Sequence, residues 1–219
     1  MDRHLEVFLE RFGAATQPSP AAVETIARYR GKLPDKLLEY WQDIGFSSFM
    51  NGLFWVTDPA EFDDSLEAWL GDTSILEEDA YHVIGRSGFG DLYLWGEKNG
   101  HKYVLNPANG WVLQEDGDRS EIASRGGDSP LKRFFAVITP EFCDLSDEKK
   151  NALFARAVAK FGPLARDEVF AFEPALMAGG KATLDHIGKR NIHVHLSILA
   201  QFGQREILNR QALARKAFG

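Results

Sequence analysis

The sequence predicts an α+β fold in which N-terminal helices pack on an antiparallel sheet and a mostly helical C-terminal domain follows. Two patterns support this prediction. Apolar residues recur at helical spacing in 3–44 and again after 131, whereas 45–114 holds short β-rich runs separated by turn residues. The composition agrees, because 44% of the 219 residues are apolar and 12% are aromatic, which is enough to form a packed core.

Three amphipathic helices are expected before the first strand. The first covers 3–12. Ser19 suits the N-cap of the second helix and Pro20 its first turn, where proline is favoured. Pro34 opens the third helix, and Gly45 is its expected end.

Residues 45–114 predict an antiparallel meander that includes one acidic helix. Asn99–Gly100 and Asn109–Gly110 lie between β-rich runs, and Asn-Gly in that position is a strong hairpin signal. The expected strands are 52–56, 81–87, 91–97 and 102–115, and the expected helix is 59–70.

The strand at 91–97 is expected to be central in this sheet. Strand alternation places Leu92 and Leu94 on one face, and Tyr93 and Trp95 on the other. Both faces are apolar, so this strand should be covered on both sides. Two tryptophans on apolar helix faces are also expected inside the protein, namely Trp41 and Trp69.

A polar, glycine-rich stretch over 115–130 ends in a proline and predicts a linker. It divides the chain into a domain over 1–114 and a mostly helical domain over 131–219. Within the second domain, Ser146 is expected to cap a helix, and 183–216 to form one or two further helices.

Charge is distributed unevenly along the chain. The net charge is −7, but residues 1–130 carry 11 basic and 23 acidic residues, whereas 131–219 carry 14 basic and 9 acidic residues. Residues 58–79 contain nine acids and neither lysine nor arginine. Such a segment is typical of a solvated face, yet it also attracts cationic partners, and its self-repulsion favours the second interpretation. The residues predicted to bind a basic partner are Asp58, Glu61, Asp63, Asp64, Glu67, Asp72, Glu77, Glu78 and Asp79.

No motif predicts catalysis, a metal site or a cofactor. His193 and His195 are two residues apart in a helical pattern, so their rings diverge by about 200° and cannot share a metal. Cys143 lacks the flanking motif of a thiol nucleophile, and the pair Asp63 and Asp64 has no partner motif for acid–base chemistry. We therefore expect no catalytic residues, no metal and no cofactor.

The sequence further predicts a cytoplasmic protein. No apolar run approaches the ~20 residues of a membrane span, and the N-terminal residues lack the apolar core of a signal peptide. The single cysteine excludes an intrachain disulfide, which fits a reducing compartment. The number of subunits is not predicted.

Two parts of the chain resemble known families. Residues 33–62 and 84–107 resemble the GAD-like domain, which is itself similar to the Smi/Knr-type immunity folds. Residues 134–201 resemble the C-terminal domain of type VI secretion DNase-immunity proteins, which combine these two domains in this order. The first resemblance is carried by Leu33–Pro34, Trp41, Gly45, Asn51–Gly52 and the segment from Gly90 to Trp95.

The resemblance implies an immunity protein that binds and neutralises a cognate type VI secreted DNase toxin without chemistry of its own. The acidic region agrees with this, because a DNase presents a basic face to DNA and an acidic protein can cover that face. The expected partner is the toxin, with no direct contact to nucleic acid or membrane. The alternative is a regulatory or scaffold module of the same fold that binds another basic protein.

Overall fold

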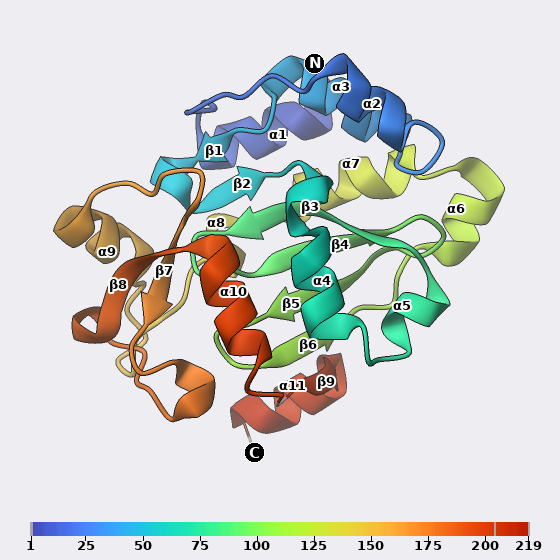
Figure 1. The fold of residues 1–219 in the computed structure, drawn as a ribbon. Coiled ribbons are helices and arrows are strands. Elements are labelled where there is room, and N and C mark those ends of the chain that lie inside the picture. The colour runs from blue at the N-terminus through green and yellow to red at the C-terminus, as the bar shows by residue number, and fades with distance from the viewer. Residues whose placement is uncertain (1, 204, 219) are drawn as a thin grey trace.

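The computed structural model describes residues 2–203 and 205–218. It confirms the α+β class, with N-terminal helices, a sheet dominated by antiparallel pairs and a largely helical C-terminal region (Figure 1). No helix among the described residues is long and apolar enough to cross a membrane. The α-helices are α1 (Arg3–Phe12), α2 (Val23–Tyr29), α3 (Asp35–Ile44), α4 (Asp63–Leu70), α5 (Ile75–Glu78), α6 (Arg119–Arg125), α7 (Asp128–Val137), α8 (Pro140–Cys143), α9 (Phe154–Phe161), α10 (Ile192–Ala200) and α11 (Arg210–Phe218). The strands are β1 (Ser48–Phe49), β2 (Phe54–Val56), β3 (Tyr81–Ser87), β4 (Leu92–Gly96), β5 (Gly100–Asn106), β6 (Trp111–Gln114), β7 (Glu168–Phe172), β8 (Ile187–Asn191) and β9 (Glu206–Asn209). Short 3₁₀ helices are η1 (Met50–Gly52), η2 (Pro59–Phe62), η3 (Leu176–Ala178) and η4 (Leu184–His186).

The main sheet has the strand order β1-β2-β3-β4-β5-β6-β9. All neighbours from β1 to β6 are antiparallel, which confirms the predicted meander. Gly100 and Gly110 take positive φ values at the predicted hairpin turns, a conformation that glycine tolerates without strain. β9 arrives from the far end of the chain and pairs in parallel with β6, placing Glu206 opposite Trp111. β7 and β8 form a separate antiparallel pair.

Both faces of β4 are covered, as predicted. Leu92 and Leu94 are fully buried in a cluster with residues of α4 and α10, and these two helices lie in front of the sheet in Figure 1. Tyr93 and Trp95 point into the opposite cluster, which includes residues of α1, α3 and α7. The sheet therefore separates two apolar layers. The two tryptophans expected inside, Trp41 and Trp69, are both fully buried.

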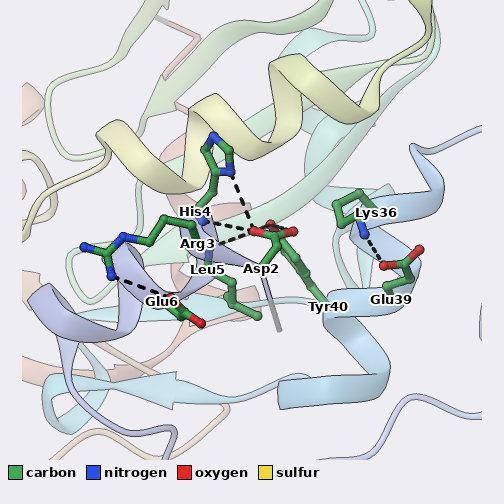
Figure 2. Close-up of polar contacts among 8 residues, drawn as sticks. All are labelled: Asp2, Arg3, His4, Leu5, Glu6, Lys36, Glu39 and Tyr40. Carbon is green, nitrogen blue, oxygen red and sulfur yellow. Dashed lines mark hydrogen bonds and ion pairs between the residues drawn. The ribbon is translucent and has the colours of Figure 1, made fainter.

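The N-terminus of α1 is anchored on α3 by a carboxylate. Asp2 caps α1 by accepting hydrogen bonds from the backbone N–H groups of His4 and Leu5, at 3.0 and 3.2 Å (Figure 2). The hydroxyl of Tyr40 donates to the same carboxylate at 2.9 Å. Partial burial opposes ionisation, but the hydrogen bonds outweigh it and hold the pKa of Asp2 below its usual value. The carboxylate of Asp2 therefore both caps α1 and holds α1 against α3.

Residues on both sides of 115–130 share one hydrophobic cluster. Asp128, at the start of α7, accepts a hydrogen bond from the backbone N–H of Lys36 at 3.0 Å and satisfies the start of α3. The rings of Phe8 and Phe135 meet edge to face at 5.3 Å, and both are fully buried. The stretch 115–130 itself contains α6 and the first residues of α7. The domain boundaries at 114 and 131 stay a prediction.

The expected start of the second helix is wrong. α2 begins at Val23, and neither Ser19 nor Pro20 belongs to it. The backbone before α2 is extended because it pairs with the segment after α3: the carbonyl of Ser19 accepts from the N–H of Phe46 at 2.8 Å. Gly45 is the correctly predicted end of α3. It lies so close to the extended segment at Ser19 that a Cβ atom at position 45 would approach the carbonyl oxygen of Ser19 to 2.7 Å. A tertiary contact overrides the local helix signal here.

The helix expected from Ser146 begins later, at Phe154. The carboxylate of Asp147 accepts hydrogen bonds from the backbone N–H groups of Lys149 and Asn151, each at 2.9 Å. Such side-chain bonds offer the backbone a turn in place of a helix. The predicted capping signal therefore belongs to a turn.

The C-terminal region also contains strands that the helical pattern did not predict. Two of these strands lie within 183–216: β8 directly precedes α10, and β9 lies between α10 and α11. β8 is short and polar, with Lys189, Arg190 and Asn191 in sequence, and it forms because β7 offers it a complete ladder. Both strands depend on partners that are distant in sequence, which periodicity within one segment cannot reveal.

Candidate functional site

The acidic segment 58–79 folds into the short helix η2 followed by α4 and α5. Asp58 caps η2 by accepting from the backbone N–H of Ala60 at 3.1 Å. α4 follows and buries Leu66 and Trp69 against the sheet. The helix therefore turns its remaining side to solvent, and this side carries Asp63, Asp64 and Glu67.

α10 lies beside α4 and completes this face (Figure 1). The indole N–H of Trp69 donates to the backbone carbonyl of Leu196 at 3.0 Å, which fixes the two helices relative to each other. Val194 and Ile198 point outward from α10, with exposed fractions of 58% and 51%. A groove of about 560 Å³ runs between the helices, lined by both apolar residues and, on the α4 side, by Asp64. We call this surface the α4–α10 face.

Two of the nine predicted acids are neutralised by arginines from the C-terminal part of the chain. Glu61 forms an ion pair with Arg166 at 2.8 Å. Asp72 forms a two-pronged contact with Arg205, whose Nη2 lies 2.9 Å from Oδ2. The uneven charge of the sequence is therefore partly balanced within the fold, at the two ends of α4.

Two further predicted acids make hydrogen bonds inside the fold and are not part of an exposed acidic surface. Asp79 is only 4% exposed, and its carboxylate accepts from the backbone N–H groups of Lys98 and Asn99, each at 2.8 Å. Glu78 pairs with Lys102 and accepts from the hydroxyl of Tyr103 at 3.1 Å. These contacts fix the β4–β5 hairpin against α5, so Asp79 lies outside any exposed acidic surface.

Four of the five remaining predicted acids lie on the surface, whereas Asp58 is half-buried where it caps η2. Asp63, Asp64, Glu67 and Glu77 are exposed, and none of them forms an ion pair within 2–203 or 205–218. Partial burial raises the pKa of Asp63, the nearby His82 and Arg28 lower it, and the charges of Asp58 and Asp64 raise it, with burial the largest effect.

Comparisons with known proteins match both halves of the chain. The model of the GAD-like domain matches residues 3–109, and the model described as T6SS immunity protein Tdi1, C-terminal, matches residues 128–203. The chain belongs to the T6SS immunity protein family. The immunity protein shares its fold with Atu4351 from Agrobacterium tumefaciens, whose crystal structure aligns with a TM-score of 0.84 at 24% identity, over 94% of this chain and 92% of that one. No curated protein matches.

Family membership implies that the immunity protein binds a protein toxin, and it suggests a non-catalytic role. Within the described residues, no group of three or more His, Cys, Asp or Glu side chains is placed to hold a metal ion. His193 and His195 lie on α10, where helical geometry directs their rings apart. Burial raises the pKa of the Cys143 thiol to about 12, which disfavours the thiolate that a nucleophile needs.

The sequence interpretation of this immunity protein missed the apolar half of the face. Val194 and Ile198 fall outside the buried stripe of α10, which consists of Ile192, Leu196 and Leu199. They are four residues apart and therefore form a second stripe on one side of the helix. That spacing was the available signal, but its place beside α4 depends on the fold.

Proposed function

We propose that this immunity protein neutralises a DNA-degrading T6SS toxin by laying its α4–α10 face on the toxin's basic DNA-binding or catalytic surface. The observation that carries the proposal is the groove between α4 and α10, where the unpaired carboxylate of Asp64 lies with the exposed apolar side chains of Val194 and Ile198. Asp63 and Glu67 extend the acidic surface on the other flank of α4, beside Leu76 and Tyr81. A nuclease must offer DNA a cationic surface, and this face complements it in charge.

The two kinds of side chain have different tasks in this proposal. Exposed acids steer a cationic partner and speed association, an effect that falls as salt screens it over ~8 Å at physiological ionic strength. The apolar residues slow dissociation, because covering half-exposed Val194 and Ile198 contributes about 1 kcal/mol each. Together they place an acidic edge on the α4 side beside an apolar strip on α10, and specific interfaces commonly combine an apolar centre with a polar edge.

Occlusion requires no chemistry from the immunity protein. In this proposal it acts in the cytoplasm, contacts neither DNA nor membrane directly, and uses no catalytic residue, metal or cofactor. The toxin loses access to DNA because the acidic face occupies the surface that binds phosphate. The alternative partner, another basic protein bound by the same fold in a regulatory or scaffold role, would use the same face without affecting a nuclease.

The test uses the nuclease toxin encoded beside the gene for this chain. Association and dissociation rates are measured at about 50 mM and about 300 mM salt, where screening differs about twofold in length. Reversing all three acids (D63K/D64K/E67K) should slow association at low salt by about 10-fold or more, and less at high salt. The fold should survive, because all three residues are exposed.

A matched control reverses three exposed acids on α2 and α3, Glu24, Asp35 and Asp43. This triple variant changes the net charge by the same amount but leaves the lining of the α4–α10 groove unaltered, so it should affect the rates much less. Equal effects of the two triple variants would show that only the overall charge matters. A toxin that does not bind the unaltered protein would refute the proposed function itself.

A further inference from the structure

A second groove lies on the opposite face of the sheet. Its volume is about 620 Å³, and its floor is formed by β4 and β5, including Tyr93 and His101. α7 and α8 form one wall and contribute Val137 and Phe142, and the segment at 115–118 forms another. We call this cavity the α7–α8 groove.

The rim of the α7–α8 groove is unusually apolar for a solvated surface. Phe142 is 74% exposed and Val137 is 58% exposed. Behind them, Phe134 and Ile138 continue the apolar wall inward and are nearly buried. An exposed aromatic ring at the mouth of a cavity marks interaction sites more often than it marks a solvated surface.

The groove is also acidic. Its lining carries the carboxylates of Asp116, Asp118 and Asp144, against the guanidinium of Arg133. Asp91 also lines the groove, but burial raises its pKa to about 7, so it adds little charge. That guanidinium is already shared, because Arg133 lies 2.6 Å from Asp118 and 2.8 Å from Glu121. Asp116 is exposed at the mouth of the groove. A cationic occupant is therefore favoured over a neutral or anionic one.

The floor contains a polar atom without a partner. Nε2 of His101 is buried and forms no hydrogen bond within the described residues. No solvent reaches this nitrogen, so it adds no hydrogen-bonding group to the surface of the groove, and the floor is apolar at this point. The ring packs against Phe134 at 4.8 Å between centroids, which holds it in place at the floor.

We propose that the α7–α8 groove is a second docking surface for the toxin, and that it takes a basic segment of the toxin in which an apolar side chain is flanked by lysine or arginine. The inference rests on the proposed function for the identity of the partner. The apolar side chain would pack on Phe142 and Val137, and the flanking cations would lie beside Asp116 and Asp144. An extended segment is required, rather than one flat surface, because the sheet separates this groove from the α4–α10 face.

The experiment measures toxin binding to a groove variant, V137A/F142A, with the toxin encoded beside this gene as the probe. Both side chains are exposed, so the variant should keep the circular dichroism spectrum and the melting temperature of the unaltered protein. We expect the dissociation rate to rise about 10-fold or more at every salt concentration, since apolar contacts are not screened. The matched control is V23A, an equally exposed valine on α2 with an exposed fraction of 78%, and it should leave the rate unchanged.

A second measurement reports proximity directly. A photoreactive p-benzoylphenylalanine is placed at position 142 or, as control, at position 23, and the complex with purified toxin is irradiated. A covalent product from position 142 alone supports the inference. Unaltered dissociation of V137A/F142A together with no covalent product at 142 would overturn it.

The two proposals fail in different ways. If the α4 charge reversal weakens toxin binding while the groove variant does not, the α4–α10 face stands and the second docking surface is wrong. If the groove variant alone weakens binding, the second surface stands and the α4–α10 face is wrong.

Discussion

Replacing Asp91 with asparagine should stabilise the protein at neutral pH and lower its stability slightly near pH 4. The carboxyl group is 6% exposed and accepts hydrogen bonds from Ser87 Oγ at 3.1 Å and Asn106 Nδ2 at 2.7 Å. It forms no ion pair within 2–203 or 205–218. Burial raises the pKa of Asp91 to about 7, and the two hydrogen bonds offset this only in part.

The sign follows from proton binding in the two states. Between pH 3.8 and about 7 the unfolded chain has lost the Asp91 proton while the folded protein retains it, so stability falls as pH rises through this window. A shift of this size corresponds to about 4 kcal/mol, or about 1.4 kcal/mol for each pH unit. An asparagine does not ionise. Its side-chain oxygen keeps one hydrogen bond, accepting from Asn106, but the other is lost, because Oγ of Ser87 already accepts from the backbone N–H groups of Phe89 and residue 91. This loss lowers the stability by about 1 kcal/mol at every pH and leaves the slope with pH unchanged.

The assay is urea unfolding followed by tryptophan fluorescence at several pH values from 4 to 8. The free energy of unfolding of D91N minus that of the unaltered protein should rise with pH and become constant above about pH 7. His101 and His195, whose pKa values burial lowers to about 4, contribute equally to both proteins and cancel in the difference.

Asp147 provides the matched control. Hydrogen bonds, chiefly from the backbone of Asn151, lower its pKa to about 2. The difference for D147N should therefore be constant from pH 5 to 8. If the D91N difference is equally flat across this range, Asp91 ionises normally in the folded protein and the reasoning from burial is wrong.

Three further predictions concern packing. Trp69→Phe removes the hydrogen bond to the carbonyl of Leu196 and should lower the free energy of unfolding by about 2 kcal/mol; a loss below about 0.5 kcal/mol in urea titrations would show that this link between α4 and α10 is dispensable. Gly88→Ala places a Cβ atom 2.2 Å from the ring of Phe154 and should cost about 1–3 kcal/mol in the same titrations, whereas an unchanged midpoint would contradict this packing. The Cys143 thiol is fully buried, so a thiol reagent should react with it only at the rate of unfolding, and rapid reaction in native buffer would contradict this placement.

The sequence predicted the elements whose signals are local. The helix at 3–12, the end of α3 at Gly45 and the hairpin turns at Gly100 and Gly110 all follow from periodicity or from backbone conformations that glycine tolerates. The burial of β4 on both faces follows from an apolar residue at every position from Leu92 to Trp95. Such signals remain valid whatever lies nearby.

The misplaced elements depend on partners that are far away in the sequence. Ser19 does not begin a helix, because its carbonyl accepts a hydrogen bond from the backbone N–H of Phe46. β9 forms as a strand because it pairs with the edge strand β6. The acidic segment shows the same limit: its residue types were evident, but nothing local distinguished Asp79, which is buried, from Asp64, which is exposed. The contribution of α10 to the candidate site arises entirely from the fold.

The most direct test of the central claim is whether the immunity protein and DNA compete for the toxin. A catalytically inactive form of the toxin encoded beside this gene is bound to a fluorescent DNA duplex, and the anisotropy of the DNA is followed as immunity protein is added. We expect the unaltered protein to displace the DNA completely. The variant D63K/D64K/E67K should need an at least about 10-fold higher concentration for the same displacement at low salt. A stable complex of toxin, DNA and immunity protein together would contradict the claim, because the acidic face could not then occupy the DNA-binding surface.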